Sequence, residues 1–159
     1  MFESIFPKKN FELEKIEIKY TKNILPELVQ SLYLSVGWQY REIKDIKNSL
    51  NKSILITSAW DKQSLIGIAR ATGDGVFNAT IWDVAVNPSY QNFGIGKLII
   101  KSMLTKLDDY DIPLITLYTK WAKKDFYSKL GFESNLNTVI GMYRYKKNNK
   151  YKDKKRRNE

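Results

Sequence analysis

Two glycines, Gly94 and Gly96, occupy a short loop between a strand-like apolar run at residues 84–86 and an amphipathic run that ends at Leu107. A glycine loop that opens a helix gathers unpaired backbone N–H groups and the positive end of the helix dipole in one place. Glycine suits this position because a Cβ atom would hold the backbone away from an anion and would resist unusual dihedral angles. The spacing therefore predicts a site for a phosphate or a pyrophosphate.

Two common anion-binding motifs do not match this loop. The dinucleotide-binding fingerprint requires a third glycine where Ile99 stands, and the P-loop requires a serine or threonine after Lys97, where Leu98 stands. The pattern that remains is Gln-x-x-Gly-x-Gly, which begins at Gln91 and lies between a strand and a helix. By itself this pattern also fits a plain helix N-terminus with a tight entry turn.

The chain contains neither cysteine nor histidine. This absence excludes disulfides, thiolate nucleophiles, Cys/His zinc sites, an imidazole base and a Ser-His-Asp triad. Chemistry near neutral pH must therefore use carboxylates, tyrosine, lysine, backbone groups or water. We expect no metal cofactor.

The 159 residues, 43% of them hydrophobic, are typical of one globular domain with a sizeable core. We expect a flexible N-terminal arm at residues 1–14, a single domain at residues 15–145 and a basic, disordered tail at residues 146–159. The tail holds eight Lys or Arg and two acidic residues, and its net charge of +6 leaves +4 of the overall +10 for the rest. We interpret the tail as a solvated end without a nucleic-acid partner, and attraction to nucleic acid is the alternative.

No apolar run approaches the ~18–20 residues needed to span a bilayer. The N-terminus has no apolar h-region, and it carries glutamates and no arginine, unlike a secretory signal or an organellar transit peptide. We therefore expect the protein to work in the compartment where it is made.

Hydrophobic periodicity and turn residues predict the elements that position the loop. Strands are expected at residues 16–20, 53–60, 64–72, 78–86, 113–119 and 139–145. Helices are expected at residues 26–36, 41–50, 95–107 and 122–130. Three consecutive antiparallel strands, followed by a glycine loop and a helix, indicate an α+β layout.

Two further segments flank the loop pattern. Pro88-Ser89-Tyr90-Gln91 leads into the loop, and Phe126-Tyr127-Ser128-Lys129-Leu130-Gly131-Phe132 follows Asp125 further along the chain. With the loop and the order of elements, these segments resemble the GNAT superfamily of N-acetyltransferases, whose signatures include Phe-Tyr-x-x-Leu-Gly-Phe. The resemblance covers about residues 16–145. It implies a GNAT fold, with a central, mostly antiparallel sheet of about six to seven strands flanked by about four helices.

Residues 81–91 and 141–145 look like one group within that superfamily. The group comprises plant chloroplast serotonin and protein-lysine acetyltransferases, their cyanobacterial relatives and versions encoded in red-algal plastids. The Lys-, Ile- and Asn-rich composition fits an AT-rich genome such as that of a plastid. The resemblance therefore implies a plastid-encoded protein of the chloroplast stroma, with a bacterial cytoplasm as the alternative.

The resemblance also implies that acetyl-CoA is the cosubstrate and that its acetyl group passes directly to a primary amine in a ternary complex. The implied contacts with the coenzyme diphosphate lie at Gln91, Asn92, Phe93, Gly94, Ile95, Gly96 and Lys97. Val84, Ala85 and Val86 would pair with the pantetheine arm, and the amide of Val86 would polarise the acetyl carbonyl. Lys120 stands where many relatives have a pantetheine-binding asparagine, and Asn92-Phe93 stands where relatives often have a basic residue or glycine.

Two residues are candidates for proton transfer. By its motif position Tyr127 would protonate the CoA thiolate, because a phenol stays protonated at neutral pH, although core packing is its alternative role. Asp83, on the opposite strand face from Trp82, is the best-placed carboxylate for a general base, with a raised pKa or through water. Asp74, Glu42 and a water chain stay open for the same role.

The amine acceptor is left open by the sequence. A protein lysine, a protein N-terminus and a small arylalkylamine such as serotonin all fit, as do a monomer and a homodimer. An aromatic wall would suit an arylalkylamine, and its candidate members are Trp38, Tyr40, Trp82 and Trp121. The alternative function is a CoA-binding regulatory or partner-binding module with little catalysis.

Overall fold

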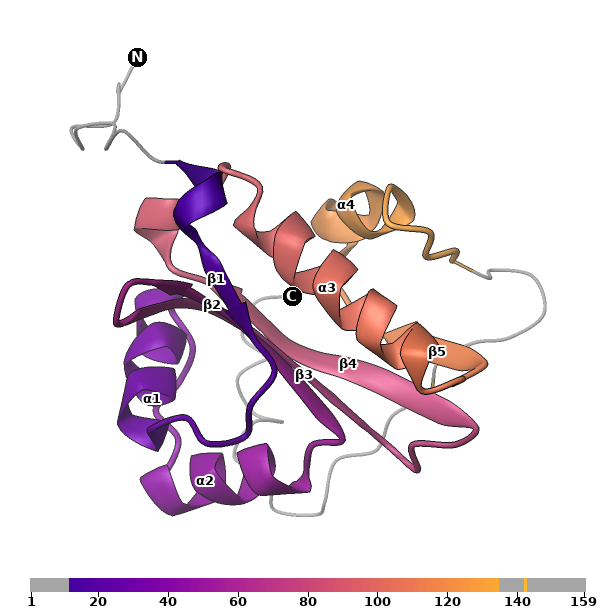
Figure 1. The fold of residues 1–159 in the computed structure, drawn as a ribbon, viewed down its shortest axis with the longest axis horizontal. Helices are drawn as coiled ribbons and strands as arrows, with labels where there is room; N and C mark the ends of the chain where they lie inside the picture. Colours follow the sequence, from indigo (N-terminus) through magenta and orange to yellow (C-terminus); the bar gives the residue numbers. More distant parts are fainter. Residues whose placement is uncertain (1–11, 135–141, 143–159) are drawn as a thin grey trace, which may run out of the picture. The chain divides into compact units, whose positions relative to one another are not determined.

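The computed structural model describes residues 12–134 and residue 142 (Figure 1). The described residues divide into two units after Lys124. In chain order the elements are η1 Leu13–Lys15, β1 Glu17–Lys19, α1 Pro26–Ser35, α2 Ile43–Lys52, β2 Leu55–Asp61, β3 Ser64–Gly73, β4 Asn78–Val86, η2 Pro88–Tyr90, α3 Ile95–Asp109, β5 Leu114–Leu117, η3 Trp121–Lys123 and α4 Lys124–Ser128, where η denotes a short 3-10 helix.

The strands of the first unit form one sheet in the order β1-β2-β3-β4-β5. Neighbours from β1 to β4 pair antiparallel, and β4 pairs with β5 in parallel. The predicted α+β class is therefore confirmed. The described residues contain five strands, fewer than the predicted six to seven. The strand predicted at residues 139–145 lies outside the described residues apart from Met142.

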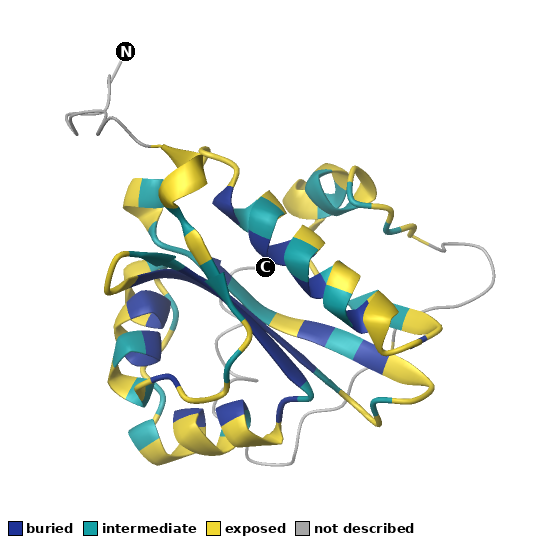
Figure 2. Ribbon diagram, viewed as in Figure 1, coloured by how far each residue is buried: buried dark blue, intermediate teal, exposed yellow. Residues whose placement is uncertain are grey.

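Helices α1 and α2 cover one face of the sheet, and α3 covers the other (Figure 1). The central strand β3 is buried from residue 65 to residue 71, because both of its faces are covered (Figure 2). The core on the side of α1 and α2 contains Ile24, Val29, Leu32, Tyr33, Ile46, Leu50, Ile56, Leu65, Ile68 and Ala85. The buried face of α3 contains Ile95, Ile99, Ile100, Met103 and Leu107. Within the described residues, no helix is both long and apolar enough to cross a bilayer.

The packing of α3 on the sheet depends on Gly67 of β3. A Cβ atom added there would lie 2.6 Å from Cδ1 of Ile99 and 3.3 Å from the C=O of Ala85. The Ile99 methyl therefore fills the space above the glycine. This close approach holds α3, and with it the loop at its N-terminus, against the middle of the sheet.

We expect a reciprocal substitution to test this contact. Gly67→Ala alone should destabilise the fold by about 1–3 kcal/mol through overpacking, and Ile99→Val alone by about 0.5–1.5 kcal/mol through a lost methyl group. The double variant should lose less stability than the sum, because valine lacks the methyl that meets the new alanine. Urea unfolding of the four proteins measures this coupling, and strictly additive losses would contradict the contact.

The helix predicted at residues 122–130 is shorter than expected. The 3-10 turn η3 leads into α4, which ends at Ser128. The N–H of Gly131 then donates to the C=O of Ser128, and Gly131 has a φ of 91° that favours glycine. The strand predicted at residues 113–119 is also shorter, since β5 covers only residues 114–117.

Candidate functional site

The pairing of β4 changes along its length. β4 pairs with β5 only from Asn78 to Ile81, which lies opposite Leu117. Just beyond, its pairing with β3 shifts register at a β-bulge, where Asp83 has a φ of 51°. Because a bulge bends and twists its strand, the parallel strands diverge. Within the described residues no strand pairs with the outer edge of β4 over residues 82–86, and we call this open edge the fork.

The N–H group of Val86 faces the fork. The N–H of the next residue, Asn87, donates to the C=O of Ile66 on β3 at 2.8 Å. Main-chain groups alternate in direction along a strand, so those of Val86 point away from β3. Its C=O accepts a hydrogen bond from the side-chain amide of Gln91 at 2.9 Å. β4 therefore presents a main-chain donor to the fork at the position predicted for carbonyl polarisation.

Side-chain hydrogen bonds hold the turn between β4 and α3. The side chain of Asn87 accepts from the N–H of Ser89 at 3.0 Å and so caps η2. The hydroxyl of Tyr90 donates to Oδ2 of Asp61 at 2.7 Å, which ties the turn to the β2–β3 hairpin. The Gln91 amide nitrogen closes the turn on β4. A direct contact between Gln91 and a coenzyme stays a prediction.

The hydrogen bond between Tyr90 and Asp61 gives a testable anchor for the loop. With acetyl-CoA as the cosubstrate that the resemblance implies, Tyr90→Phe should raise its KM by about fivefold, because an intramolecular hydrogen bond contributes about 1 kcal/mol. The kcat should stay within about twofold, since the phenol lies on the side of the expected anion site. Steady-state kinetics measure both values, with Tyr110→Phe at the far end of α3 as the control. An unchanged KM would show that the hydrogen bond between Tyr90 and Asp61 does not hold the loop for coenzyme binding.

The loop at the start of α3 has the features of an anion site. Asn92 and Gly94 have positive φ values of 68° and 86°. Gly94 is the N-cap of the 15-residue helix, and glycine has no side chain that could cap that end. The first N–H groups of the helix therefore lack acceptors within the helix, and residues 91–94 are exposed. Lys97 in the first turn and Lys120 after β5 are also exposed.

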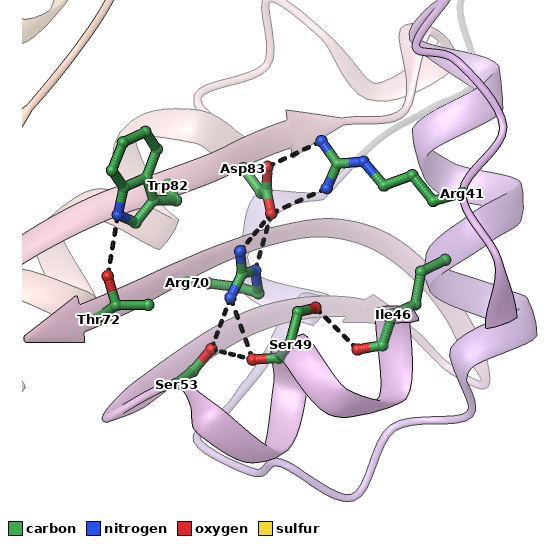
Figure 3. A network of polar contacts seen from close by, with 8 residues as sticks. All are labelled: Arg41, Ile46, Ser49, Ser53, Arg70, Thr72, Trp82 and Asp83. Carbon is green, nitrogen blue, oxygen red and sulfur yellow. Dashed lines mark hydrogen bonds and ion pairs between the residues drawn. The ribbon is translucent and has the colours of Figure 1, made fainter. Parts of the chain in front are cut away.

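Asp83 lies at the centre of a charged network on the side of α1 and α2 (Figure 3). Nε and Nη2 of Arg70 donate to its Oδ2 at 2.8 and 2.6 Å. Nη1 and Nη2 of Arg41 donate to its two oxygens at 3.2 and 3.3 Å. Nη1 of Arg70 donates to the C=O of Ser49 and to Oγ of Ser53 on the α2 side. We call Arg41, Arg70 and Asp83 the charged triad.

These contacts argue against the predicted general-base role of Asp83. Burial alone would raise its pKa, but the hydrogen bonds from Arg41 and the charges of both arginines outweigh burial and lower the pKa below its ordinary value. A carboxylate in this state is a weak proton acceptor. The bulge also corrects the expected strand face: Asp83 bonds Arg70 and Trp82 bonds Thr72, so both reach the same face of β3.

Sequence reasoning did not find Arg41 and Arg70. The usable signal was Arg70, a charged residue inside the apolar run of β3, because a buried charge needs a partner. The side chains of Arg70 and Asp83 are only 11% and 12% exposed. Nothing in the local pattern around Arg41 indicated its pairing.

The other base candidates lie elsewhere. The Asp74 carboxylate accepts from the N–H groups of Val76, Phe77 and Asn78, which lower its pKa. At a rise of about 3.3 Å per residue, this turn lies roughly 26 Å from the other end of β4. Glu42 is exposed at the N-cap of α2.

Three of the four candidate aromatic residues have different partners in the described part of the chain. Trp82 stacks on Tyr118, with ring centroids 5.6 Å apart, where the pairing of β4 with β5 ends. Trp38 packs on Tyr33 at 4.8 Å beside the core. Tyr40 is exposed, and Trp121 is exposed with Nζ of Lys124 over its ring. The stacked pair of Trp82 and Tyr118 is therefore the aromatic surface at the fork.

Tyr127 belongs to the second unit. Its ring packs edge-on against Phe126 and Phe132 at 4.9 and 6.0 Å between centroids. Burial raises the pKa of Tyr127 above its ordinary value, so the phenol keeps its proton at neutral pH. A protonated phenol fits a general acid, and that role stays a prediction.

A family model described as the acetyltransferase (GNAT) domain matches residues 52–134, which include the fork, the loop and Tyr127. The chain belongs to the GNAT family. It is an acetyltransferase with a GNAT fold, of mixed α/β class, in which the described residues form five strands and four α-helices. The matched residues contain all the predicted coenzyme contacts.

Relatives of this GNAT enzyme come from plastid-bearing organisms, among others. It is 39% identical to "Uncharacterized N-acetyltransferase ycf52" of Porphyra purpurea over 84% of this chain and 79% of the relative. It is 36% identical to "GCN5-related N-acetyltransferase 2, chloroplastic" of Arabidopsis thaliana over 75% of this chain and 54% of the relative. A solved GNAT family protein from Streptococcus pneumoniae, SP0256, superposes with a TM-score of 0.68 at 30% identity, covering 82% and 99% of the two chains. These matches confirm the predicted family and its plastid group of homologues.

Proposed function

We propose that this GNAT enzyme transfers the acetyl group of acetyl-CoA directly to a primary amine in a ternary complex. The observation that carries the proposal is the continuity of the fork with the start of α3. An open strand edge that presents the Val86 N–H leads, through one hydrogen-bonded turn, to a helix whose N-cap, Gly94, has no side chain to cap it. An elongated substrate with a thioester at one end and a diphosphate further along fits this arrangement.

The residues present fit such a coenzyme. Backbone N–H groups of Ile95, Gly96 and Lys97 would hold the diphosphate, because the helix end supplies donors and a positive dipole. Glycine adopts the positive φ of Gly94 without strain, and its backbone, which has no Cβ, allows a close approach of a phosphate. The exposed Lys97 in the first turn of α3 and Lys120 after β5 would add positive charge. Main-chain groups of Val84 and Val86 would pair with the pantetheine amides.

Two groups of the chain would carry the chemistry. Acetyl-CoA supplies the activated thioester whose carbonyl carbon the neutral amine attacks. The Val86 N–H would donate to the carbonyl oxygen as negative charge develops on it. The Tyr127 hydroxyl would give its proton to the departing thiolate sulfur. The amine loses its proton to water, because the charged triad makes Asp83 a poor acceptor.

The proposal also covers the amine acceptor and the cellular compartment of the enzyme. A protein lysine, a protein N-terminus and an arylalkylamine are the candidate acceptors, and the stacked rings of Trp82 and Tyr118 offer a surface for an apolar amine. The proposed compartment is a plastid stroma, supported by the similarity to the chloroplastic protein of Arabidopsis and to the red-algal protein.

A thiol-release assay tests the proposed function. Because the chain has no cysteine, a thiol-reactive dye reports only the CoA that is released. The acceptors are a lysine peptide with a blocked N-terminus, an unblocked peptide without lysine, and serotonin. We expect release that needs both acetyl-CoA and at least one of these amines. CoA binding without release for any amine would favour the regulatory-module alternative instead.

A further inference from the structure

We propose that Asp83 is a positioning residue, whose ion pairs with Arg70 and Arg41 hold the β4 bulge so that the Val86 N–H faces the fork. The proposal concerns how the chain builds its carbonyl-polarising donor, and its catalytic meaning rests on the proposed function. In this proposal the charged triad has a structural role, which is to hold the bulge, and does not transfer protons.

The bulge decides which amides of β4 face the fork. The C=O of Ala71 accepts from Ile54 on the β2 side, so the main-chain groups of its neighbour Arg70 point to β4. Arg70 lies opposite Trp82, whose main-chain groups therefore point to β3. After the bulge Asn87, an odd-numbered residue, points to β3. The extra residue at the bulge therefore changes which residues of β4 point their main-chain groups to β3, from even-numbered to odd-numbered ones. Without the bulge the Val86 N–H would point to β3.

The conformation of Asp83 is one that a residue with a side chain adopts at a cost. Its φ of 51° lies in the left-handed region, which aspartate and asparagine tolerate better than most residues. A costly conformation persists where surrounding contacts determine it. The four guanidinium hydrogen bonds to its carboxylate are such contacts.

The triad fixes the bulge from two elements. Arg70 lies on β3, and its guanidinium is also held by the C=O of Ser49 on α2 and by Oγ of the α2 C-cap Ser53. Arg41 reaches Asp83 from the connection between α1 and α2, with its guanidinium carbon 4.9 Å from the Tyr33 ring centre and 5.6 Å from that of Trp38. The helices that cover this face are thereby coupled to the strand that presents the donor.

The experiment compares Asp83→Asn, Arg41→Met and the double variant with Lys44→Met, which removes an exposed charge on α2. Asparagine keeps the shape and the tolerance of a positive φ but loses the charge. We expect each triad variant to lower kcat by about 10- to 100-fold, as for a misplaced catalytic group, and the double variant to lose no more than the worse single one. The KM for acetyl-CoA should change less than about threefold, because the α3 loop is untouched.

A pH profile and amide exchange separate positioning from proton transfer. The acidic limb of the kcat/KM profile should remain in Asp83→Asn, and hydrogen exchange at Asn87, which bonds β3, should accelerate about tenfold or more in both triad variants but not in Lys44→Met. Loss of the acidic limb in Asp83→Asn, additive effects in the double variant, or unchanged exchange at Asn87 would each overturn the proposal. The exchange measurement does not depend on catalysis. If the wild-type protein were inactive, the proposed function would be refuted, but amide exchange would still test whether the charged triad holds the bulge.

Discussion

Gly94→Val is expected to raise the KM for acetyl-CoA by about 10- to 100-fold, because the strain of a β-branched residue at this φ costs about 1–3 kcal/mol. Gly94 has a φ of 86° and forms the N-cap of α3. Valine would have to leave the left-handed region, and the turn would then re-form with its N–H groups aimed elsewhere. Its side chain would also stand beside Leu13 of η1, since an added Cβ lies 3.8 Å from Cδ2 of that residue. Initial rates at varied acetyl-CoA concentration measure the change.

Gly75→Val is the matched control for this prediction. Gly75 has a φ of 74° and nothing within 4 Å of an added Cβ, and it lies in the turn between β3 and β4. It should lose a similar amount of stability, about 1–3 kcal/mol, with an unchanged KM. Equal effects of the two valines on the KM would show that the loop matters only through global stability, and would contradict an anion site at Gly94.

Tyr127→Phe is expected to lower kcat by about 100-fold, the lower range for loss of a general acid, while the KM for acetyl-CoA stays unchanged. Phenylalanine keeps the edge-on packing against Phe126 and Phe132 and removes only the hydroxyl. The loss should be similar from pH 6 to pH 9, because burial raises the pKa of the wild-type phenol and keeps it protonated over that range. Steady-state kinetics at several pH values measure both parameters.

The Tyr127 prediction has its own control in Tyr110→Phe, at the C-cap of α3. That change removes a hydroxyl from an exposed tyrosine outside the site and should leave kcat unaltered. A Tyr127→Phe enzyme with wild-type kcat would assign Tyr127 to packing and would leave thiolate protonation to water.

Much of the fold was predictable because local signals agreed with it. Pro26 begins α1, and the apolar spacing from Ile95 to Leu107 predicts the buried face of α3. The glycine pattern located the helix N-terminus, since a positive φ at Gly94 is a backbone requirement that sequence expresses directly. The observed ends of α1 and α3 therefore lie within two residues of the predicted ends.

The environment of Asp83 could not be predicted, because it depends on contacts between distant residues. Period-2 alternation placed Asp83 opposite Trp82, but one inserted residue at the bulge cancels that rule. The arginine partners come from residue 41 and residue 70, and no local pattern joins them. The same holds for Tyr90, whose partner Asp61 lies 29 positions earlier. The glycine pattern located the start of α3 and the family resemblance pointed to Val86, whereas side-chain pairing needed the folded chain.

The central claim is that main-chain N–H groups at the start of α3 and at the end of β4 bind the coenzyme. Titration of the 15N-labelled protein with CoA, followed by amide chemical shifts, tests it most directly. We predict saturable shifts that are largest at Ile95, Gly96, Lys97 and Val86, with little change at the β3–β4 turn around Gly75. Saturation with CoA that leaves those four amides unshifted, or no binding at millimolar CoA, would contradict the account.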